Sequence, residues 1–328
     1  MERIYHKILN CDLKASPWIA VVGPTGAGKT ELGIFLAKEF NGEIISADSR
    51  QIYKFLDAGT AKPPRDSQGR CQGIFYHLVD FLDPQNPFNA GNFAALARPL
   101  LLDIKSRNRI PIIVGGTGLY LKALSQGLSP ALPQADFQVR ENLLNICAEK
   151  GRLFLHQELQ KIDPLAAEKI PANNIQRVIR ALEVYEISKR PISDFWKQEK
   201  KESEKFVTLR IQWPIEILRQ KLRERCLRMW PEILEETARL VPKNYCGQEP
   251  GFQSLGYSQA VACLKGEISP EEGLKHFIKE TLSYAKRQRT WFNHQIKDPV
   301  FEIAGNQPSL MFSEASAILK RLEISNAQ

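Results

Sequence analysis

Residues 18–38 read WIAVVGPTGAGKTELGIFLAK, and this stretch decides the fold. An apolar run at 18–22 leads into the pattern G-x-x-x-x-G-K-T at 23–30, and a helix-forming segment follows. A strand, a glycine-rich turn and a helix in this order are typical of a P-loop. Gly26 and Gly28 let the backbone point its N–H groups inward, and the start of the helix adds a positive dipole end. The stretch therefore predicts a site for a diphosphate or triphosphate.

Two side chains of the loop add chemistry of their own. Lys29 supplies a mobile positive charge, and the Thr30 hydroxyl is an oxygen ligand of the kind that Mg²⁺ accepts. We therefore expect Mg²⁺ as the cofactor, with Thr30 as its protein ligand. The alternative, a tight structural turn without a ligand, is disfavoured by the strand and helix on either side.

Composition excludes several classes of protein. The 328 residues, 43% hydrophobic and 25% charged, suit a globular protein of one large domain or two smaller ones. No apolar run reaches about 18 residues, and the N-terminus lacks the apolar core of a signal peptide. The six cysteines form no C-x-x-C pair, which argues against a zinc site or a disulfide framework. We expect a cytoplasmic protein that does not span a membrane.

The formal net charge of +8 favours polyanionic partners, although many basic enzymes bind none. Five cations lie within residues 219–228, and six more lie within residues 275–297. Taken alone, each cluster is better explained as a solvated helix face.

Strand and helix patterns alternate in the first part of the chain. The alternation predicts an α/β fold, a P-loop-type parallel sheet flanked by helices, with ligands at the carboxyl ends of the strands. Strands are predicted at 19–22, 42–46, 75–82, 110–114 and 206–213, and helices at 30–40, 89–107 and 119–125.

A Pro-rich stretch at 127–133 marks a hinge or linker. Helical patterns without strands follow it, and a strand pattern resumes at 206. We therefore predict a first part of the P-loop core at 1–129, a mainly helical insertion at 130–205, and completion of the core with C-terminal helices at 206–328. The helices are predicted at 139–150, 153–161, 175–188, 215–240 and 270–296.

A carboxylate follows the second predicted strand. Asp48 should face the phosphate loop, because the carboxyl ends of parallel strands share one edge of the sheet. A carboxylate there would bind Mg²⁺ through water or accept a proton. Asp48 and Ser49 are also a good helix-capping pair, and the sequence leaves both interpretations open.

The strand at 110–114 leads into a second glycine-rich turn. Glycines at 115, 116 and 118 would allow a ligand to approach the backbone closely. A tight connection is the simpler interpretation of this turn.

Two basic segments each have a functional and a structural interpretation. Arg177 and Arg180 share one helix face and suit an anion, but Glu183 and Glu186 continue that face and would form ion pairs with them. Residues 284–292 interleave cations with aromatics, which suits phosphate contact with base stacking. Alternatively, the aromatic residues of this segment belong to the core and its cations face water.

Seven motifs in order carry a resemblance to a known family. They are GPTGAGKT (23–30), DSRQIYKFLDAGTAKP (48–63), YHLVD (76–80), PIIVGGTGLYLKAL (111–124), QRVIRALEV (176–184), LGYSQA (255–260) and YAKRQRTWF (284–292). Together they resemble the bacterial tRNA dimethylallyltransferases, also called tRNA isopentenyltransferases, over nearly the whole chain.

The resemblance implies a reaction and its substrates. The P-loop would hold the diphosphate of dimethylallyl diphosphate. The dimethylallyl group would move to N6 of adenosine 37, beside the anticodon, in tRNAs that read codons beginning with U. The partner would be the anticodon stem-loop, with the base flipped into a channel between the α/β core and the helical insertion.

The resemblance also implies roles for individual residues. Asp48 would receive the N6 proton, with Thr25 and Lys29 as further catalytic residues. The diphosphate would contact Gly23, Pro24, Thr25, Gly26, Ala27, Gly28, Lys29, Thr30 and Arg225. The tRNA would contact Asp48, Ser49, Arg50, Gln51, Thr117, Arg140, Gln176, Arg177, Val178, Ile179, Arg180, Lys286 and Arg287.

Three other functions compete with this interpretation. An adenylate isopentenyltransferase would prenylate free AMP to make a cytokinin, and a P-loop nucleotide kinase would use a triphosphate. The basic segments at 176–180 and 284–292 favour tRNA over AMP, and the intact P-loop disfavours a non-enzymatic RNA-binding module. We expect the protein to act as a monomer.

Overall fold

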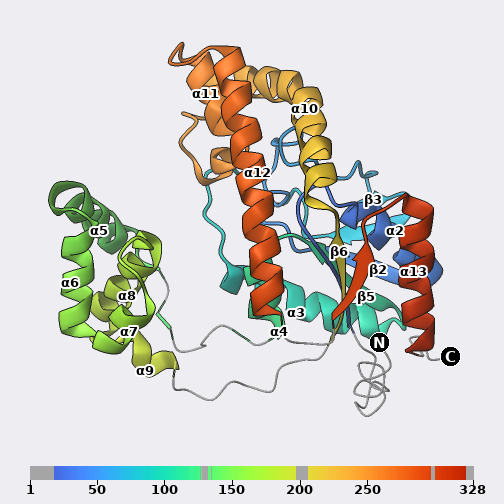
Figure 1. Ribbon diagram of the computed structural model, residues 1–328, viewed down its shortest axis with the longest axis horizontal. Coiled ribbons are helices and arrows are strands. Elements are labelled where there is room, and N and C mark those ends of the chain that lie inside the picture. Colours follow the sequence, from blue (N-terminus) through green and yellow to red (C-terminus); the bar gives the residue numbers. More distant parts are fainter. Residues whose placement is uncertain are drawn as a thin grey trace. The chain divides into compact units, whose positions relative to one another are not determined.

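The computed structural model describes residues 18–125, 127, 132–133, 135–196, 206–296 and 300–322. Contacts between residues divide the chain into two compact units. The larger unit comprises Met1–Ser125 and Glu204–Gln328, and the smaller unit comprises Gln126–Ser203. Figure 1 shows the elements of both units along the chain.

The larger unit is built on a seven-stranded sheet in the order β3-β4-β2-β5-β1-β6-β7 (Figure 1). Neighbouring strands run parallel except for the antiparallel pair β3 and β4. This sheet confirms the predicted α/β class. The strands are β1 Trp18–Val22, β2 Gly42–Ser46, β3 Arg70–Cys71, β4 Ile74–His77, β5 Ile110–Gly115, β6 Phe206–Gln212 and β7 Val300–Ala304.

Helices cover both faces of the sheet, so the central strands are apolar throughout rather than alternating. Ile19 and Val21 pack in one cluster with α2 (Lys29–Glu39) and α13 (Pro308–Arg321). Ala20 and Val22 pack in a second cluster with α3 (Ala90–Ser106) and α4 (Gly118–Ser125). The P-loop is therefore held between two layers at the end of a buried strand.

The predicted strand at 75–82 is wrong in length. Its pairing ends at His77, because Leu78 and Asp80 have φ of 58° and 61°, a left-handed backbone that cannot continue a strand. The sequence patterns also missed β7 and α13, which add a parallel edge strand and a helix beyond β6.

A third cluster lies around the long C-terminal helices. It is formed by α10 (Ile215–Asn244), a 3₁₀ turn (Pro250–Gln253), α11 (Tyr257–Leu264) and α12 (Pro270–Gln295), with the loop after β2 packed among them. The cluster ties the segment that follows Asp48 to helices nearly 200 residues later in the chain. None of the helices that the structure describes is both long and apolar enough to cross a bilayer.

The regular elements of the smaller unit are all helices in the part that the structure describes. Its buried core includes Leu155, Leu159, Val178 and Leu182. Residues 128–131 of the predicted linker lie outside the described residues. The helices are α5 Phe137–Lys150, α6 Arg152–Ile162, α7 Pro164–Lys169, α8 Ile175–Ser188 and α9 Ile192–Trp196.

Candidate active site

The P-loop has the geometry that its glycines predict. Gly26 and Gly28 have φ of 72° and 91°, values that favour glycine. A Cβ on Gly26 would be strained at this φ and would lie 2.8 Å from a methyl group of Leu222 of α10, which would have to move. Helix α2 starts at Lys29 without a side-chain cap on its first N–H groups. These N–H groups are therefore available to an anion.

Lys29 is held at the mouth of the loop. Its ammonium donates a hydrogen bond of 2.7 Å to the carbonyl of Pro24. Burial lowers the pKa of Lys29 to about 8, with the charge of Asp48 opposing the shift and that of Arg225 adding to it. A bound diphosphate would supply the negative charge that favours the ammonium form.

Helix α10 places three cations around the same loop. Lys221, Arg225 and Arg228 recur at i, i+4 and i+7 and line the cavity beside the loop. The Arg225 guanidinium lies 3.9 Å from the position of a Cβ on Gly26, and burial lowers its pKa. The prediction of a solvated face is therefore wrong for Arg225, whereas Lys221 and Arg228 line the cavity and are still exposed.

The cavity has a volume of about 620 Å³, within the range of small-molecule sites. Its polar wall is the P-loop with Asp48, Lys62 and the three cations of α10. Its apolar wall comes from separate parts of the chain and comprises Ile34, Pro63, Pro64, Val114, Trp213, Met229, Met311 and Phe312. The cavity thus combines phosphate donors with an apolar surface.

Asp48 lies at the end of β2 and lines this cavity. Its Oδ1 accepts hydrogen bonds from the backbone N–H groups of Arg50 at 2.8 Å and Gln51 at 3.4 Å. No helix follows Asp48, so the helix-capping interpretation is wrong, and Oδ1 closes a turn instead. The second carboxylate oxygen takes part in neither bond, so the turn does not exclude an acid–base role.

Ser49 and Thr117 meet where β2 and β5 end. The Ser49 N–H donates to Oγ1 of Thr117 at 3.0 Å, and the Thr117 hydroxyl donates to that of Ser49 at 3.3 Å. Burial raises the pKa of the neighbouring Tyr284 to about 12, and the charge of Asp48 adds to the rise. The structure thus brings Asp48 and two of the expected tRNA-contacting residues to one strand edge.

Arg50 and Gln51 hold the following loop. The Arg50 guanidinium donates to the carbonyl of Pro250 at 3.1 Å. Gln51 is buried, accepts a hydrogen bond from Ser46, and donates to the carbonyls of Thr60 and Ala61. The Gln51 amide is thus used to hold the loop, and the residue also lines the cavity.

The residues around Thr30 suit Mg²⁺ bound together with a diphosphate. Thr30, Asp48 and Tyr76 all line the cavity. Among the residues that the structure describes, no group of three or more His, Cys, Asp or Glu side chains forms a metal cage. Mg²⁺ commonly uses one or two protein oxygens with substrate phosphates and water, so this donor set fits it.

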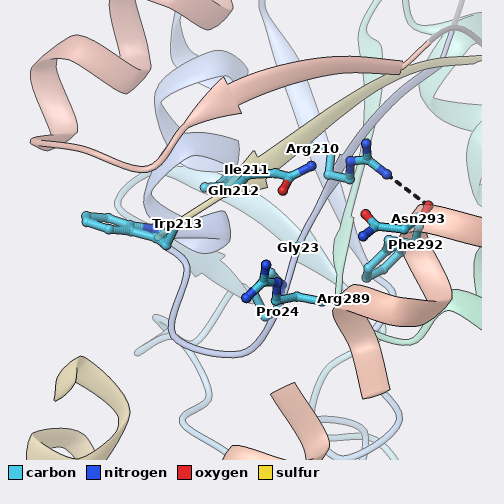
Figure 2. A pocket seen from close by; sticks show the side chains of 9 residues that line it. All are labelled: Gly23, Pro24, Arg210, Ile211, Gln212, Trp213, Arg289, Phe292 and Asn293. Atoms are coloured by element: carbon cyan, nitrogen blue, oxygen red, sulfur yellow. Dashed lines mark hydrogen bonds between the residues drawn. The ribbon is translucent and has the colours of Figure 1, made fainter. Parts of the chain in front are cut away.

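Figure 2 shows the back of the P-loop, where β6 and α12 meet it. Gly23, Pro24 and Arg289 line a cavity of about 10 Å³, the size of one water molecule. Arg210 donates to the carbonyl of Phe292 at 3.0 Å, as the dashed line in Figure 2 marks. This side of the loop is packed closed, so a ligand has room on the opposite side.

The segment 284–292 splits between core and surface. Phe292 is buried and Trp291 packs against the same cluster, so the structural alternative is correct for both. Lys286 and Arg287 are exposed, and the Arg287 guanidinium lies 5.8 Å from the ring centre of Tyr284. The two cations remain available to an anionic partner.

Within the smaller unit, Arg140 and Arg180 share a buried carboxylate. Each donates to Oε2 of Glu183 at 2.8 Å, and the Asp136 N–H donates to Oε1 at 2.9 Å. The predicted ion-pair ladder is thus correct for Arg180 and Glu183. It is wrong for Glu186, which pairs with Lys189.

The other residues of the 176–180 segment divide by exposure. Gln176 and Arg177 are exposed. Val178 and Ile179 are 0% and 3% exposed within the core of the smaller unit. A predicted contact with tRNA through these two side chains is therefore wrong. Their apolar character serves packing of α8.

Two buried side chains that support the site were not predicted from the sequence. Glu236 of α10 accepts the N–H groups of Asp57 and Ala58 and the Tyr257 hydroxyl, and so clamps the loop that leads to Lys62. Gln288 of α12 bonds the P-loop itself. The i, i+4, i+7 spacing could have revealed the cations of α10, whereas neither support has a local signal.

A P-loop and a carboxylate that share one basic cavity at the carboxyl edge of a parallel sheet define a phosphate-binding α/β enzyme. A family model described as IPP transferase matches residues 51–295, which is most of the chain. The chain belongs to this family of transferases, and the resemblance seen in the motifs is confirmed.

Curated relatives carry the name tRNA dimethylallyltransferase. The protein from Acetivibrio thermocellus is 40% identical over 277 residues, which cover 84% of this chain and 88% of the relative. The protein from Solibacter usitatus is 36% identical over 309 residues, which cover 93% of this chain and 99% of the relative.

Solved structures of similar proteins share the fold over most of the chain. The full-length tRNA isopentenylpyrophosphate transferase from Bacillus halodurans has a TM-score of 0.65 at 32% identity, with 94% of this chain and 97% of that chain covered. A eukaryotic dimethylallyltransferase acting on tRNA has a TM-score of 0.75 at 28% identity, with 92% of this chain and 77% of that chain covered.

Proposed function

We propose that this enzyme transfers the dimethylallyl group of dimethylallyl diphosphate to N6 of adenosine 37 in tRNA. The observation that carries the proposal is the single cavity in which the P-loop, Arg225 and Asp48 meet. A diphosphate held by the loop would lie within the same cavity as the carboxylate. Membership of the family supports the choice of reaction.

The donor side of the cavity suits departure of a diphosphate. Breaking the C1–O bond leaves the electron pair on the diphosphate, so groups that stabilise negative charge speed the step. The free N–H groups of α2, the Lys29 ammonium and the Arg225 guanidinium are such groups. Mg²⁺ bound at Thr30 would add charge neutralisation when present.

The acceptor side suits loss of a proton from an exocyclic amine. N6 of adenine is weakly basic and loses a proton as the new N–C bond forms. The oxygen of Asp48 that does not cap the turn is available to accept this proton. The base must leave its stack to reach the site, which costs little in an RNA loop.

We assign tRNA contact to the exposed cations. Arg177 in the smaller unit and Lys286 and Arg287 on α12 are exposed and suit phosphates. Arg140 and Arg180 are partly exposed but share Glu183, so they contribute less net charge. We further propose that the enzyme works in the cytoplasm on free tRNA. That it acts as a monomer stays a prediction.

The test is incubation of the enzyme with dimethylallyl diphosphate, Mg²⁺ and an unmodified tRNA transcript, followed by nucleoside mass spectrometry. In parallel reactions AMP or ATP replaces the transcript. A matched transcript with guanosine at position 37 is the control. The proposal expects dimethylallyladenosine from the first transcript and none from the second. Prenylated AMP without modified tRNA would support the cytokinin alternative. Hydrolysis of ATP without prenyl transfer would support the kinase alternative.

A further inference from the structure

Gln288 joins the P-loop to the second glycine-rich turn. Its Oε1 accepts the N–H of Thr25 at 2.8 Å, and its Nε2 donates to the carbonyl of Gly116 at 2.9 Å. The side chain is 6% exposed and comes from α12, more than 170 residues from either partner. One amide thus bridges the loop assigned to the donor and the turn that carries Thr117.

Successive turns of α12 rest on the same glycine-rich turn. Tyr284 lies beside Thr117, and Gln288 bonds Gly116 one turn later. A Cβ on Gly116 would lie 2.2 Å from the Gln288 amide, and a Cβ on Gly118 would lie 2.1 Å from the Trp291 ring. Gly116 and Gly118 are therefore explained by the close approach of α12, which neither the ligand interpretation nor the tight-connection interpretation of this turn foresaw.

The bridge ends close to both reacting sides. Thr25 begins the part of the P-loop that lines the cavity, and Lys29 is fixed to the neighbouring Pro24. Thr117 follows Gly116 and bonds Ser49, which itself follows Asp48. A shift at Gln288 would therefore change the distance between the diphosphate loop and the carboxylate edge.

We propose that Gln288 is a positioning residue that keeps the donor loop and the acceptor edge in register for prenyl transfer. The inference rests on the proposed function, because it assigns the two sides to donor and acceptor. Reaction requires close approach of C1 and N6, and a misplacement of about 1 Å can cost about 100-fold in rate. Gln288 contacts neither reacting atom, so it acts through the two loops.

The bridge needs a group that accepts at one atom and donates at the other. An amide does so, and so does a neutral carboxylic acid, whereas a carboxylate only accepts. Gln288→Met fills the space without either bond. Gln288→Glu should fail while ionised, because its oxygen would face the Gly116 carbonyl, and should recover once protonated. Burial favours the neutral acid.

The first experiment measures the single-turnover rate of dimethylallyl transfer to an anticodon stem-loop RNA. Gln288→Met is compared with wild type and with Glu280→Gln, a change on the exposed side of α12. The rate should fall roughly 10- to 100-fold in Gln288→Met, with Kd values for Mg²⁺–pyrophosphate and RNA changed less than about threefold. An equal rate in Gln288→Met and Glu280→Gln would overturn the proposal.

The second experiment follows the rate of Gln288→Glu relative to wild type as pH falls. The ratio should rise toward one as the buried carboxyl gains its proton. A ratio that stays well below one at every pH would overturn the proposal. Failure of both Gln288 variants to fold would also overturn it, since the residue would then serve the fold alone.

The transfer rate of the wild-type enzyme distinguishes failure of this inference from failure of the proposed function. Absence of transfer by wild-type enzyme would overturn the proposed function and the inference with it. Wild-type transfer with unaffected Gln288 variants would overturn the inference and leave the proposed function standing.

Discussion

Lys29 should make the binding of pyrophosphate depend on pH. Burial lowers the pKa of its ammonium to about 8, so the free enzyme loses this charge as pH rises through that value. A diphosphate binds better to the charged form. Between pH 7 and pH 9 the charged fraction of a group with a pKa near 8 falls about tenfold, and the apparent Kd should rise by the same factor.

Calorimetric titration of Mg²⁺–pyrophosphate into wild type, Lys29→Met and Lys29→Arg at three pH values measures this effect. Methionine is of similar length and carries no charge, and arginine stays charged throughout the range. Dividing the wild-type Kd by that of Lys29→Met removes the ionisation of pyrophosphate itself. From pH 7 to pH 9 the ratio of the wild-type Kd to the Lys29→Met Kd should rise about tenfold. The corresponding ratio for Lys29→Arg should stay constant.

Unfolding does not account for such a loss of affinity. The pKa of Lys29 lies below its ordinary value of 10.5, so the unfolded chain holds more protons between pH 8 and 10.5. The contribution of this group to stability therefore rises with pH in that window. A wild-type affinity in constant ratio to that of Lys29→Met from pH 7 to 9 would refute the reasoning.

Other substitutions test the rest of the site. Asp48→Asn should keep pyrophosphate binding and lower the single-turnover rate by roughly two to four orders of magnitude; a normal rate would leave Asp48 only its role in the turn. Arg225→Met should weaken pyrophosphate binding in titrations, and Arg223→Met, on the exposed side of α10, should not; equal effects would contradict the cavity assignment. Arg177→Gln should lower the slope of log affinity against log salt for tRNA by about one unit; an unchanged slope would remove Arg177 from the contact. Glu236→Leu should lower the free energy of unfolding in urea by about 2 kcal/mol or more, because three donors lose their acceptor; an unchanged midpoint would show that water replaces the carboxylate.

Local patterns were sufficient for the parts of the site made by neighbouring residues. The P-loop needs glycines, a lysine and a hydroxyl at set spacings between a strand and a helix, and these are visible in 23–30. Asp48 could be placed because a residue just after a parallel strand lies at the carboxyl edge of the sheet. Helix α8 was predicted with its observed bounds, because its apolar period of 3.6 is strong.

Contacts between distant segments could not be predicted from local sequence patterns. Whether a basic residue faces water or a cavity depends on what packs against its helix, so the burial of Arg225 beside the P-loop could not be predicted from the charge cluster on α10. The same holds for Gln51 and Gln288, whose amides are polar in sequence but bond backbone groups of other loops. Spacing along the chain determines which residues share a strand end or a helix face. Which of those faces meet is determined by packing of the whole core. The hydrophobic effect is non-directional, so an apolar face in the sequence does not indicate which other face it packs against.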